Sequence, residues 1–256
     1  MKCYEMVFSP TGGTKKIAEI VAKQWECEKQ YIDLTKPDLD ISTVKVEEND
    51  ICIIAVPSFA GRVPAPAAEK IKVITGNGAK AVAICVYGNR AYDDTLVELV
   101  DLCEEADLKV AAALAAISEH SIMRQFAAGR PDKEDMEILE EFAKKIKEKI
   151  NSGNIDIDAK IPGNRPYIEA KAVPMKPKTT MSCNGCSLCA TECPVGAISI
   201  DNPRKTDKEK CISCMKCISI CPKHARKVSK LMLKMASKKM AGAFAERKES
   251  ELFIWK

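Results

Sequence analysis

Long apolar runs, aromatic side chains and an excess of charge of one sign are all scarce in this chain of 256 residues. The longest uncharged apolar run, residues 110–117, is far too short to cross a bilayer, which takes about 20 residues. Aromatic residues make up 5% of the chain and the net charge is +4, unlike the basic, aromatic-rich composition of single-strand nucleic-acid binders. Neither a membrane span nor a nucleic-acid partner is expected.

Two common nucleotide-binding motifs are also missing. The chain has no G-x-x-x-x-G-K-[ST] segment, so ATP and GTP are poorly supported as ligands. It has no G-x-G-x-x-G segment that opens a helix, since Gly76-Asn77-Gly78 precedes a strand pattern, so direct use of NAD(P)H is not supported. The first strand pattern begins at about Lys2 and leaves no room for a signal peptide, and we expect a cytoplasmic protein.

What the first 150 residues do contain is an alternation of strand and helix patterns. Strand-like runs fall at 3–8, 30–34, 51–57, 80–87 and 109–117, and helical patterns at 14–25, 65–75, 93–107 and 132–150. The last three strand runs are almost entirely apolar, which is typical of parallel strands covered on both faces. The alternation predicts an α/β domain over residues 1–150, with a doubly wound five-stranded parallel sheet.

The loop after the first strand reads Ser-Pro-Thr-Gly-Gly-Thr and turns directly into a helix pattern. Free backbone N–H groups and the positive end of the helix dipole converge there, which favours a bound phosphate. The alternative is an ordinary turn in which Thr14 caps the helix. Two more loops leave the same rim, at residues 58–62 and 88–92, where ligands of such sheets bind. Each combines glycine, a planar side chain and arginine, which suits a flat heteroaromatic ring, although both loops could also be solvated turns.

The T-G-x-T loop, with ring-contacting loops after the third and fourth strands, resembles flavodoxin over roughly residues 1–150. The resemblance implies a bound FMN. Flavodoxins often sandwich the ring between Trp and Tyr, whereas this chain offers only Phe59, Tyr87 or Tyr92. By resemblance, the residues that hold the phosphate are Ser9, Pro10, Thr11, Gly12, Gly13 and Thr14, and those that line the flavin are Ser58, Phe59, Ala60, Gly61, Arg62, Tyr87, Gly88, Asn89, Arg90, Ala91 and Tyr92.

Two features follow the fifth strand. His120, one of two histidines, lies on the same predicted rim, where a capping or loop-packing role is favoured over proton donation to a reduced flavin. Residues 151–179 contain four prolines and two glycines with no sustained periodicity, and they are interpreted as a linker, extended in its proline-rich part.

The thirteen cysteines are unevenly distributed. Five of them lie in the first 170 residues, mostly inside apolar strands or helices, and are interpreted as buried hydrophobes: Cys3, Cys27, Cys52, Cys85 and Cys103. The other eight form two copies of C-x2-C-x2-C-x3-C-P, starting at Cys183 and Cys211. Zinc sites use paired C-x2-C units, whereas a third cysteine at the same interval and a fourth before proline is the spacing of cubane clusters.

The block resembles the bacterial two-cluster ferredoxin, over residues 180–225. The resemblance implies two [4Fe–4S] clusters with crossed ligand sets, one set being Cys183, Cys186, Cys189 and Cys221 and the other Cys211, Cys214, Cys217 and Cys193. Shielding of the clusters is expected from Ile198, Ile200, Ile212 and Ile218. Gly185 would let the chain wrap closely around a cluster.

Residues 226–256 form a basic tail with apolar side chains interleaved. We interpret it as an amphipathic helix that packs on the protein or docks a partner, in preference to a lipid surface, because Glu246, Glu249 and Glu251 follow the lysines.

As a whole, the chain resembles the flavodoxin–ferredoxin fusion proteins of anaerobic bacteria and archaea, which are iron–sulfur flavoproteins. The favoured function is electron transfer between two [4Fe–4S] clusters and FMN, in a carrier that converts between one- and two-electron steps and whose partner is an unidentified redox protein. The alternative is a flavin-dependent reductase of a quinone, nitro compound or oxygen, with His120 or Tyr92 as the proton donor. No catalytic residue is assigned, and both enzymatic activity and homo-oligomerisation stay open. A metal-sensing regulator is a third possibility, but the sequence has no helix-turn-helix or strongly basic patch through which such a regulator would act on DNA.

Overall fold

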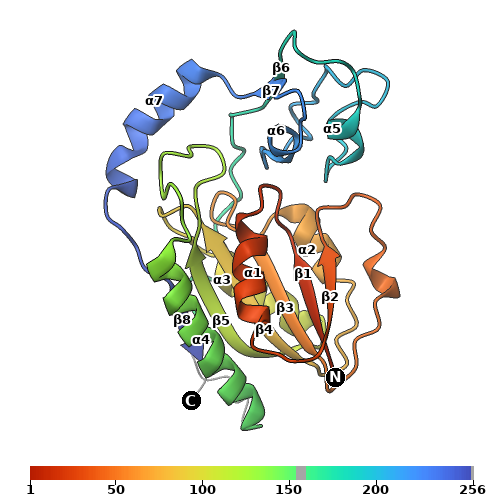
Figure 1. Cartoon of the computed structure of the whole chain (residues 1–256), viewed down its shortest axis with the longest axis vertical. Coiled ribbons are helices and arrows are strands. Elements are labelled where there is room, and N and C mark those ends of the chain that lie inside the picture. The colour runs from red at the N-terminus through yellow and green to blue at the C-terminus, as the bar shows by residue number, and fades with distance from the viewer. Residues whose placement is uncertain (154–159, 255–256) are drawn as a thin grey trace.

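The computed structural model describes residues 1–153 and 160–254, and its larger part is a six-stranded sheet with helices on both faces (Figure 1). Five strands are parallel, in the spatial order β2-β1-β3-β4-β5, which is the order of the flavodoxin-like fold. Each predicted strand is present within two residues of its expected bounds: β1 (Lys2–Val7), β2 (Glu28–Asp33), β3 (Ile51–Pro57), β4 (Lys80–Tyr87) and β5 (Lys109–Ile117).

Two pairs of helices sandwich the sheet (Figure 1). α1 (Gly13–Ala22) and α4 (Lys133–Asn151) cover one face, and α2 (Ala65–Ile71) and α3 (Thr95–Glu105) cover the other. β3, β4 and β5 are buried along nearly their whole length, which explains their continuous apolar sequences. All four predicted helices exist, although α1 and α2 end earlier than the periodicity suggested. A single 3-10 turn, η1 (Ile41–Thr43), lies between β2 and β3.

The C-terminal segment supplies a sixth strand that the sequence did not predict. β8 (Glu251–Ile254) pairs antiparallel with β5, Leu252 lying opposite Leu114. It follows α7 (Lys230–Met240), the helix expected in the tail, and the short turn η2 (Ala241–Phe244). Phe244 is buried, and its ring stacks on Phe126 with the centroids 4.1 Å apart. The tail therefore packs on the protein mainly through η2 and β8, since α7 itself has no fully buried residue.

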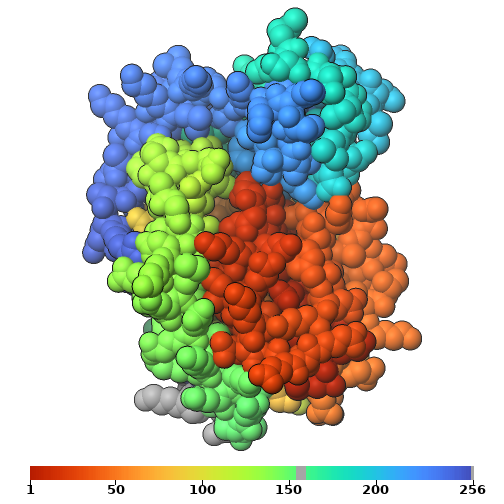
Figure 2. All heavy atoms as spheres, in the orientation of Figure 1, coloured from red at the N-terminus to blue at the C-terminus, as the bar shows by residue number. Residues whose placement is uncertain are grey.

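The cysteine-rich segment forms a small unit around two short strands, β6 (Lys178–Thr179) and β7 (Arg226–Lys227), and two short helices, α5 (Leu188–Thr191) and α6 (Lys216–Ser219). It is seated on the rim of the sheet beside the start of α1 (Figure 2). A buried lysine lies at the contact, where the Lys216 ammonium lies 2.9 Å from the half-buried Glu192 and donates to the Thr35 hydroxyl at 2.7 Å. The Lys36 ammonium bonds the same carboxylate at 2.6 Å.

The expected linker, residues 151–179, begins with the last residue of α4 and ends with β6, and between them residues 160–177 run without helix or strand over the α/β domain. The Asp94 carboxylate accepts the backbone N–H groups of Asn164 at 2.9 Å and Ile168 at 2.6 Å. Arg165 pairs with Asp101 at 2.9 Å. These bonds attach the segment to α3, whereas residues 154–159 lie outside the described part of the chain.

Burial tests several smaller expectations. Four of the five dispersed cysteines are completely buried, as predicted for small hydrophobes: Cys3, Cys52, Cys85 and Cys103. Ile198 is 5% exposed, but Ile200 is 64% exposed, so the shielding expected from Ile200 was wrong. Within residues 1–153 and 160–254, no helix is both long and apolar enough to span a membrane.

Candidate functional site

The loop between β1 and α1 presents backbone N–H groups at the carboxyl rim of the sheet. Gly12 is the N-cap of α1 with φ +95°, a left-handed conformation that favours glycine, and no side chain caps the helix there. The Ser9 hydroxyl accepts the N–H of Lys15 at 3.0 Å. Among the described residues, no hydrogen bond uses the N–H groups of Gly12, Gly13 or Thr14. Thr14 does not cap the helix, contrary to the alternative interpretation, and these free donors suit an anion.

Two glycines allow the loops of this rim to approach one another closely. A Cβ atom on Gly13 would lie 2.2 Å from the Oγ of Ser118, at the end of β5. A Cβ atom on Gly88 would lie 2.8 Å from the ring of His120. Any side chain at either position would therefore push the loops after β1 and β4 away from the segment after β5.

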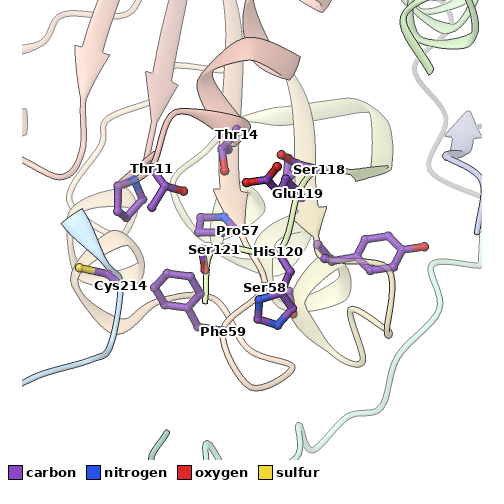
Figure 3. A pocket seen from close by; sticks show the side chains of 15 residues that line it. Thr11, Thr14, Pro57, Ser58, Phe59, Ser118, Glu119, His120, Ser121 and Cys214 are labelled. Carbon is purple, nitrogen blue, oxygen red and sulfur yellow. The ribbon is translucent and has the colours of Figure 1, made fainter. Parts of the chain in front are cut away.

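These loops enclose a cavity at the ends of the parallel strands. Thr11 and Thr14 line one side of it, and Phe59, His120 and Cys214 line the other (Figure 3). It adjoins a mostly apolar cavity of about 770 Å³, which shares Ser58, Phe59, Tyr87, Gly88, His120 and Ser121 with it. The larger cavity is also walled by residues 171–175 and by Phe244. Its volume falls in the range of small-molecule and cofactor sites, about 300–1,000 Å³.

Most of the predicted flavin residues line one of these two cavities: Pro10, Thr11, Gly13, Thr14, Ser58, Phe59, Ala60, Gly61, Tyr87, Gly88, Arg90 and Ala91. Ser9 and Gly12 shape the first loop instead.

Three residues that were predicted to line the flavin lie in neither cavity, and their side chains form hydrogen bonds or ion pairs with other parts of the chain. Arg62 pairs with Glu98 at 2.7 Å, and Tyr92 donates its hydroxyl to Glu251 at 2.7 Å. The buried Asn89 accepts the backbone N–H of Lys248 at 3.0 Å. Of the three aromatic side chains expected to contact a ring, Phe59 and Tyr87 line the larger cavity and Tyr92 does not.

His120 has both its orientation and its charge fixed by its surroundings. Its Nδ1 accepts the backbone N–H groups of Ile122 at 3.1 Å and Met123 at 3.2 Å, so the proton of the neutral ring lies on Nε2. Burial lowers the pKa of His120 to about 4. The loop-capping role predicted for this residue is present, and at neutral pH the ring can donate a hydrogen bond but holds no imidazolium proton.

The eight clustered cysteines line two further cavities, four in each. Both sets draw on both motifs: one cavity is lined by Cys183, Cys186, Cys189 and Cys221, and the other by Cys193, Cys211, Cys214 and Cys217. These are the crossed sets that the sequence resemblance implied, and their role as ligands stays a prediction. Among the described residues, no group of three or more His, Cys, Asp or Glu side chains could hold one metal ion. A cube separates its ligands, because each thiolate binds a different iron.

The chain around the cysteines fits such cubes. Gly185, between Cys183 and Cys186, has φ +77°, a left-handed conformation that favours glycine. Backbone N–H groups point at cysteine sulfurs in both halves, from Ala197 to Cys193 and from Ala225 to Cys221, each at 3.3 Å. Four sulfurs per cavity, with N–H donors to some of them, is the donor set of a [4Fe–4S] cluster.

Cys214 connects the two kinds of site, because it lines both the cavity at the sheet rim and one of the cysteine cavities. The other cysteine cavity shares no lining residue with the cavity at the sheet rim, and its Cys186 is exposed. No local sequence signal indicates this adjacency, or the walls that residues 171–175 and Phe244 contribute. The segment Ser118–Ser121 could be anticipated, because it follows a strand that ends on the same rim.

Comparison with known proteins agrees with the cysteine pattern. Residues 182–225 match the family described as the 4Fe-4S dicluster domain. Over 56 residues the chain is 39% identical to a protein of the ion-translocating oxidoreductase complex of Methanosarcina acetivorans. That match spans 22% of this chain and 21% of the curated relative, about a fifth of each.

Solved flavodoxins align with the α/β part. Flavodoxin 1 from Bacillus cereus is 19% identical, with 58% of this chain and 98% of that chain covered and a TM-score of 0.45. A flavodoxin from the domain Archaea is 16% identical, with coverages of 59% and 99% and a TM-score of 0.43. The fold assignment itself rests on the strand order. The chain thus joins a flavodoxin-like sheet to a 4Fe-4S dicluster domain, a combination that supports electron transfer in general.

Proposed function

We propose that this chain transfers electrons between two [4Fe–4S] clusters and one FMN, and so converts between one- and two-electron steps. When bound, each cluster would carry one electron at a time and the flavin one or two. The observation that supports the proposal most strongly is the position of Cys214, which lines both the cavity beside the loop between β1 and α1 and one of the two cysteine cavities. We call the first of these the flavin cavity. We call the set with Cys214 the inner cysteine set and the set with Cys186 the outer cysteine set.

The chain's own residues would hold the flavin without any acid–base machinery. The free N–H groups of Gly12, Gly13 and Thr14 suit the phosphate. Phe59 and Tyr87 line the cavity that would take the ring. Residues 171–175 and Phe244 line the same cavity from the C-terminal half of the chain.

The two halves are joined by contacts that fix the inner set beside the flavin cavity. The Ser219 hydroxyl donates to the carbonyl of Pro10 at 3.0 Å, inside the phosphate loop. The Lys216 ammonium, with its side chain 8% exposed, bonds Glu192 and Thr35. Because electron transfer depends on separation, a fixed contact of this kind supports transfer within one chain.

We further propose that the redox partner is an acidic protein that docks on the exposed basic surface of residues 178–240. Residues 178–240 contain thirteen Lys and Arg against four Asp and Glu. Eleven of the thirteen are exposed, and none of these eleven forms an ion pair with another described residue. Leu231 and Met235 of α7 are 68% and 65% exposed beside the lysine row of residues 230, 234 and 238. Complementary charge would steer such a partner.

The partner proposal is tested by stopped-flow reduction of the chain with an acidic, reduced ferredoxin. We expect the Lys234→Glu/Lys238→Glu variant to react about tenfold more slowly at low salt, and high salt to remove the difference. Lys144→Glu, an exposed lysine on α4, is the control. Equal rates for all three proteins would contradict the proposed surface, as would stronger binding of the wild type to anionic vesicles than to the ferredoxin.

The main proposal is tested by the composition of protein purified without oxygen. It predicts about one FMN and about eight iron atoms per chain, with coupled cluster signals in the EPR spectrum of the reduced state. Zinc in place of iron, when iron is supplied, would overturn it. Thiolate-ligated clusters need a reducing compartment, so the proposal also places the chain in the cytoplasm.

A small-molecule reductase is the second candidate, and the cavity of about 770 Å³ is the observation in its favour. The expected proton donors do not support it. His120 is neutral at pH 7, and the Tyr92 hydroxyl donates to Glu251 outside the cavity, where burial raises the pKa of Tyr92. Steady turnover of a quinone, nitro compound or oxygen by the reduced protein, faster than by free FMN, would favour this function.

A further inference from the structure

The two cysteine cavities are related by an internal repeat, but only one half of the repeat carries a buried cation beside its cavity in the compared segment. The segment Cys193-Pro-Val-Gly-Ala-Ile198 corresponds to Cys221-Pro-Lys-His-Ala-Arg226. Ile198 lines the inner cavity and is 5% exposed. Arg226 lines the outer cavity and is 2% exposed. A buried cation therefore stands in one half where the other half has a buried alkyl group.

Arg226 is surrounded by neutral partners only. Its guanidinium donates to the Thr206 hydroxyl at 2.5 Å, to the carbonyl of Pro203 and to the sulfur of Cys189 at 3.5 Å. Its Nε is buried and has no hydrogen-bond partner among the residues that the structure describes. Within the same residues, none of the ion pairs involves Arg226, whereas the buried Lys216 of the cysteine-rich segment has one.

An isolated buried cation is strongly disfavoured, and arginine cannot relieve the cost by losing its proton. The missing negative charge must come from something that occupies the neighbouring cavity. A cube with four thiolate ligands is anionic, and it gains a further negative charge when it accepts an electron. The orphaned Nε and the bond to Cys189 place the cation where that charge would develop.

We propose that Arg226 is the built-in counter-ion of the outer cluster and raises its reduction potential above that of the inner cluster. This inference rests on the proposed function, since it requires both clusters. Hydrogen bonds to the sulfurs and nearby charge are established determinants of cluster potential. The outer cluster would then take the first of two electrons, one per cluster, that an added reductant supplies.

The surroundings of the inner set support the difference. Lys216 is also buried beside a cavity, but its charge is offset by Glu192 at 2.9 Å. The backbone N–H bonds to the sulfurs of Cys193 and Cys221 have the same length, 3.3 Å, so this pair of bonds does not separate the two potentials. Lys223, which stands where the first half has Val195, also lines the outer cavity but is exposed to water. Arg226 is therefore the buried charge that distinguishes the compared segments.

The test is an EPR-monitored redox titration of the complete protein under anaerobic conditions. Arg226→Ile copies the other half of the repeat. We expect the higher of the two cluster potentials to fall. At a fixed applied potential, the ratio of reduced to oxidised outer cluster should drop at least tenfold, which corresponds to a shift of about 59 mV in the reduction potential of a one-electron couple. Arg226→Lys keeps the charge but loses the planar fork, and a smaller fall is expected.

Arg204→Gln is the matched control, because Arg204 is exposed and donates to the carbonyl of Cys183 at 2.6 Å, beside the same set. It removes the same charge where water screens it, and a change of less than twofold is expected. Unchanged potentials in Arg226→Ile, or an equal shift in Arg204→Gln, would overturn the inference. If Arg226→Ile loses iron, Arg226→Gln, which removes the charge but keeps a hydrogen-bond donor, decides, and an unshifted potential there overturns the inference.

Failure of the underlying function gives a different result. In that case the wild-type protein itself contains no pair of clusters, which iron analysis shows before any titration. Eight iron atoms with two equal potentials in the wild type would instead leave the function standing and refute the role of Arg226.

Discussion

Gly13 offers a sharp test of the flavin site, because the start of α1 depends on the absence of a side chain there. In Gly13→Ala, the new Cβ atom would lie 2.2 Å from the Oγ and 3.2 Å from the Cβ of Ser118. Real Cβ atoms do not approach other atoms to 2.2 Å, so the loop or Ser118 must move. Overpacking of this kind costs about 1–3 kcal/mol. If this cost falls on the conformation of the loop that binds the phosphate, it weakens FMN binding by the same free energy, which is a loss of affinity of roughly 5- to 150-fold.

The assay is quenching of FMN fluorescence by the flavin-free protein, with the dissociation constant measured for each variant. Gly13→Ala/Ser118→Ala should recover part of the affinity, because only the 3.2 Å contact then remains. Gly242→Ala is the control, since no atom lies within 4 Å of its Cβ position and its φ is not left-handed. FMN binding by Gly13→Ala with the wild-type dissociation constant would refute this account of the loop.

Three further predictions concern the clusters, the contact between the halves and His120. Cys221→Ser should reduce the iron content from about eight to about four atoms by removing the cluster of the first motif, and loss of the second-motif EPR signal instead would contradict the crossed sets. Glu192→Gln should lower the free energy of unfolding by about 1–3 kcal/mol, because it leaves Lys216 buried beside Thr35 alone. Bonds from Lys36 and Lys216 hold the pKa of the Glu192 carboxyl below its usual value. The contribution of Glu192 to the free energy of unfolding is therefore complete above pH ~4.3 and is lost as the pH falls through the lowered pKa. Urea unfolding at several pH values would detect this loss. His120, with a pKa of about 4 in the fold against about 6.5 when unfolded, should make stability rise with pH over that interval by roughly 1–3 kcal/mol, and His120→Asn, which keeps an acceptor for Ile122 and Met123, should abolish this rise.

Much of the α/β half follows from local sequence patterns. Parallel strands buried on both faces, such as Ile51–Pro57 and Lys80–Tyr87, read as continuous apolar runs, so their existence and bounds were predictable. The three ligand loops were predictable for the same reason, because parallel strands end on one rim. Arg62, Asn89 and Tyr92 illustrate the limit of this reasoning. Their bonds go to Glu98, Lys248 and Glu251, all distant in sequence, and no local pattern reports such pairings.

The C-terminal segment shows the same limit on a larger scale. β8 is four residues long, too short for its alternation to stand out against the lysines and glutamates around it. Its partner β5 lies more than a hundred residues earlier, and only the tertiary fold brings Leu252 opposite Leu114. The cysteine sets are the opposite case, because their spacing repeats within one short segment. Ile200 was misjudged since the repeat indicates apolar positions but not which of them faces solvent.

The most direct test of the central claim is the rate of flavin reduction in the complete, oxidised protein after rapid anaerobic mixing with a limiting amount of dithionite. Absorbance of the clusters and of the flavin would be followed together, and Cys214→Ser would give the rate of direct flavin reduction. Transfer within one chain predicts that the clusters are reduced first and that the flavin follows with a first-order rate constant that is unchanged over a tenfold range of protein concentration. A rate proportional to protein concentration, or a flavin that stays oxidised beside reduced clusters, would contradict it.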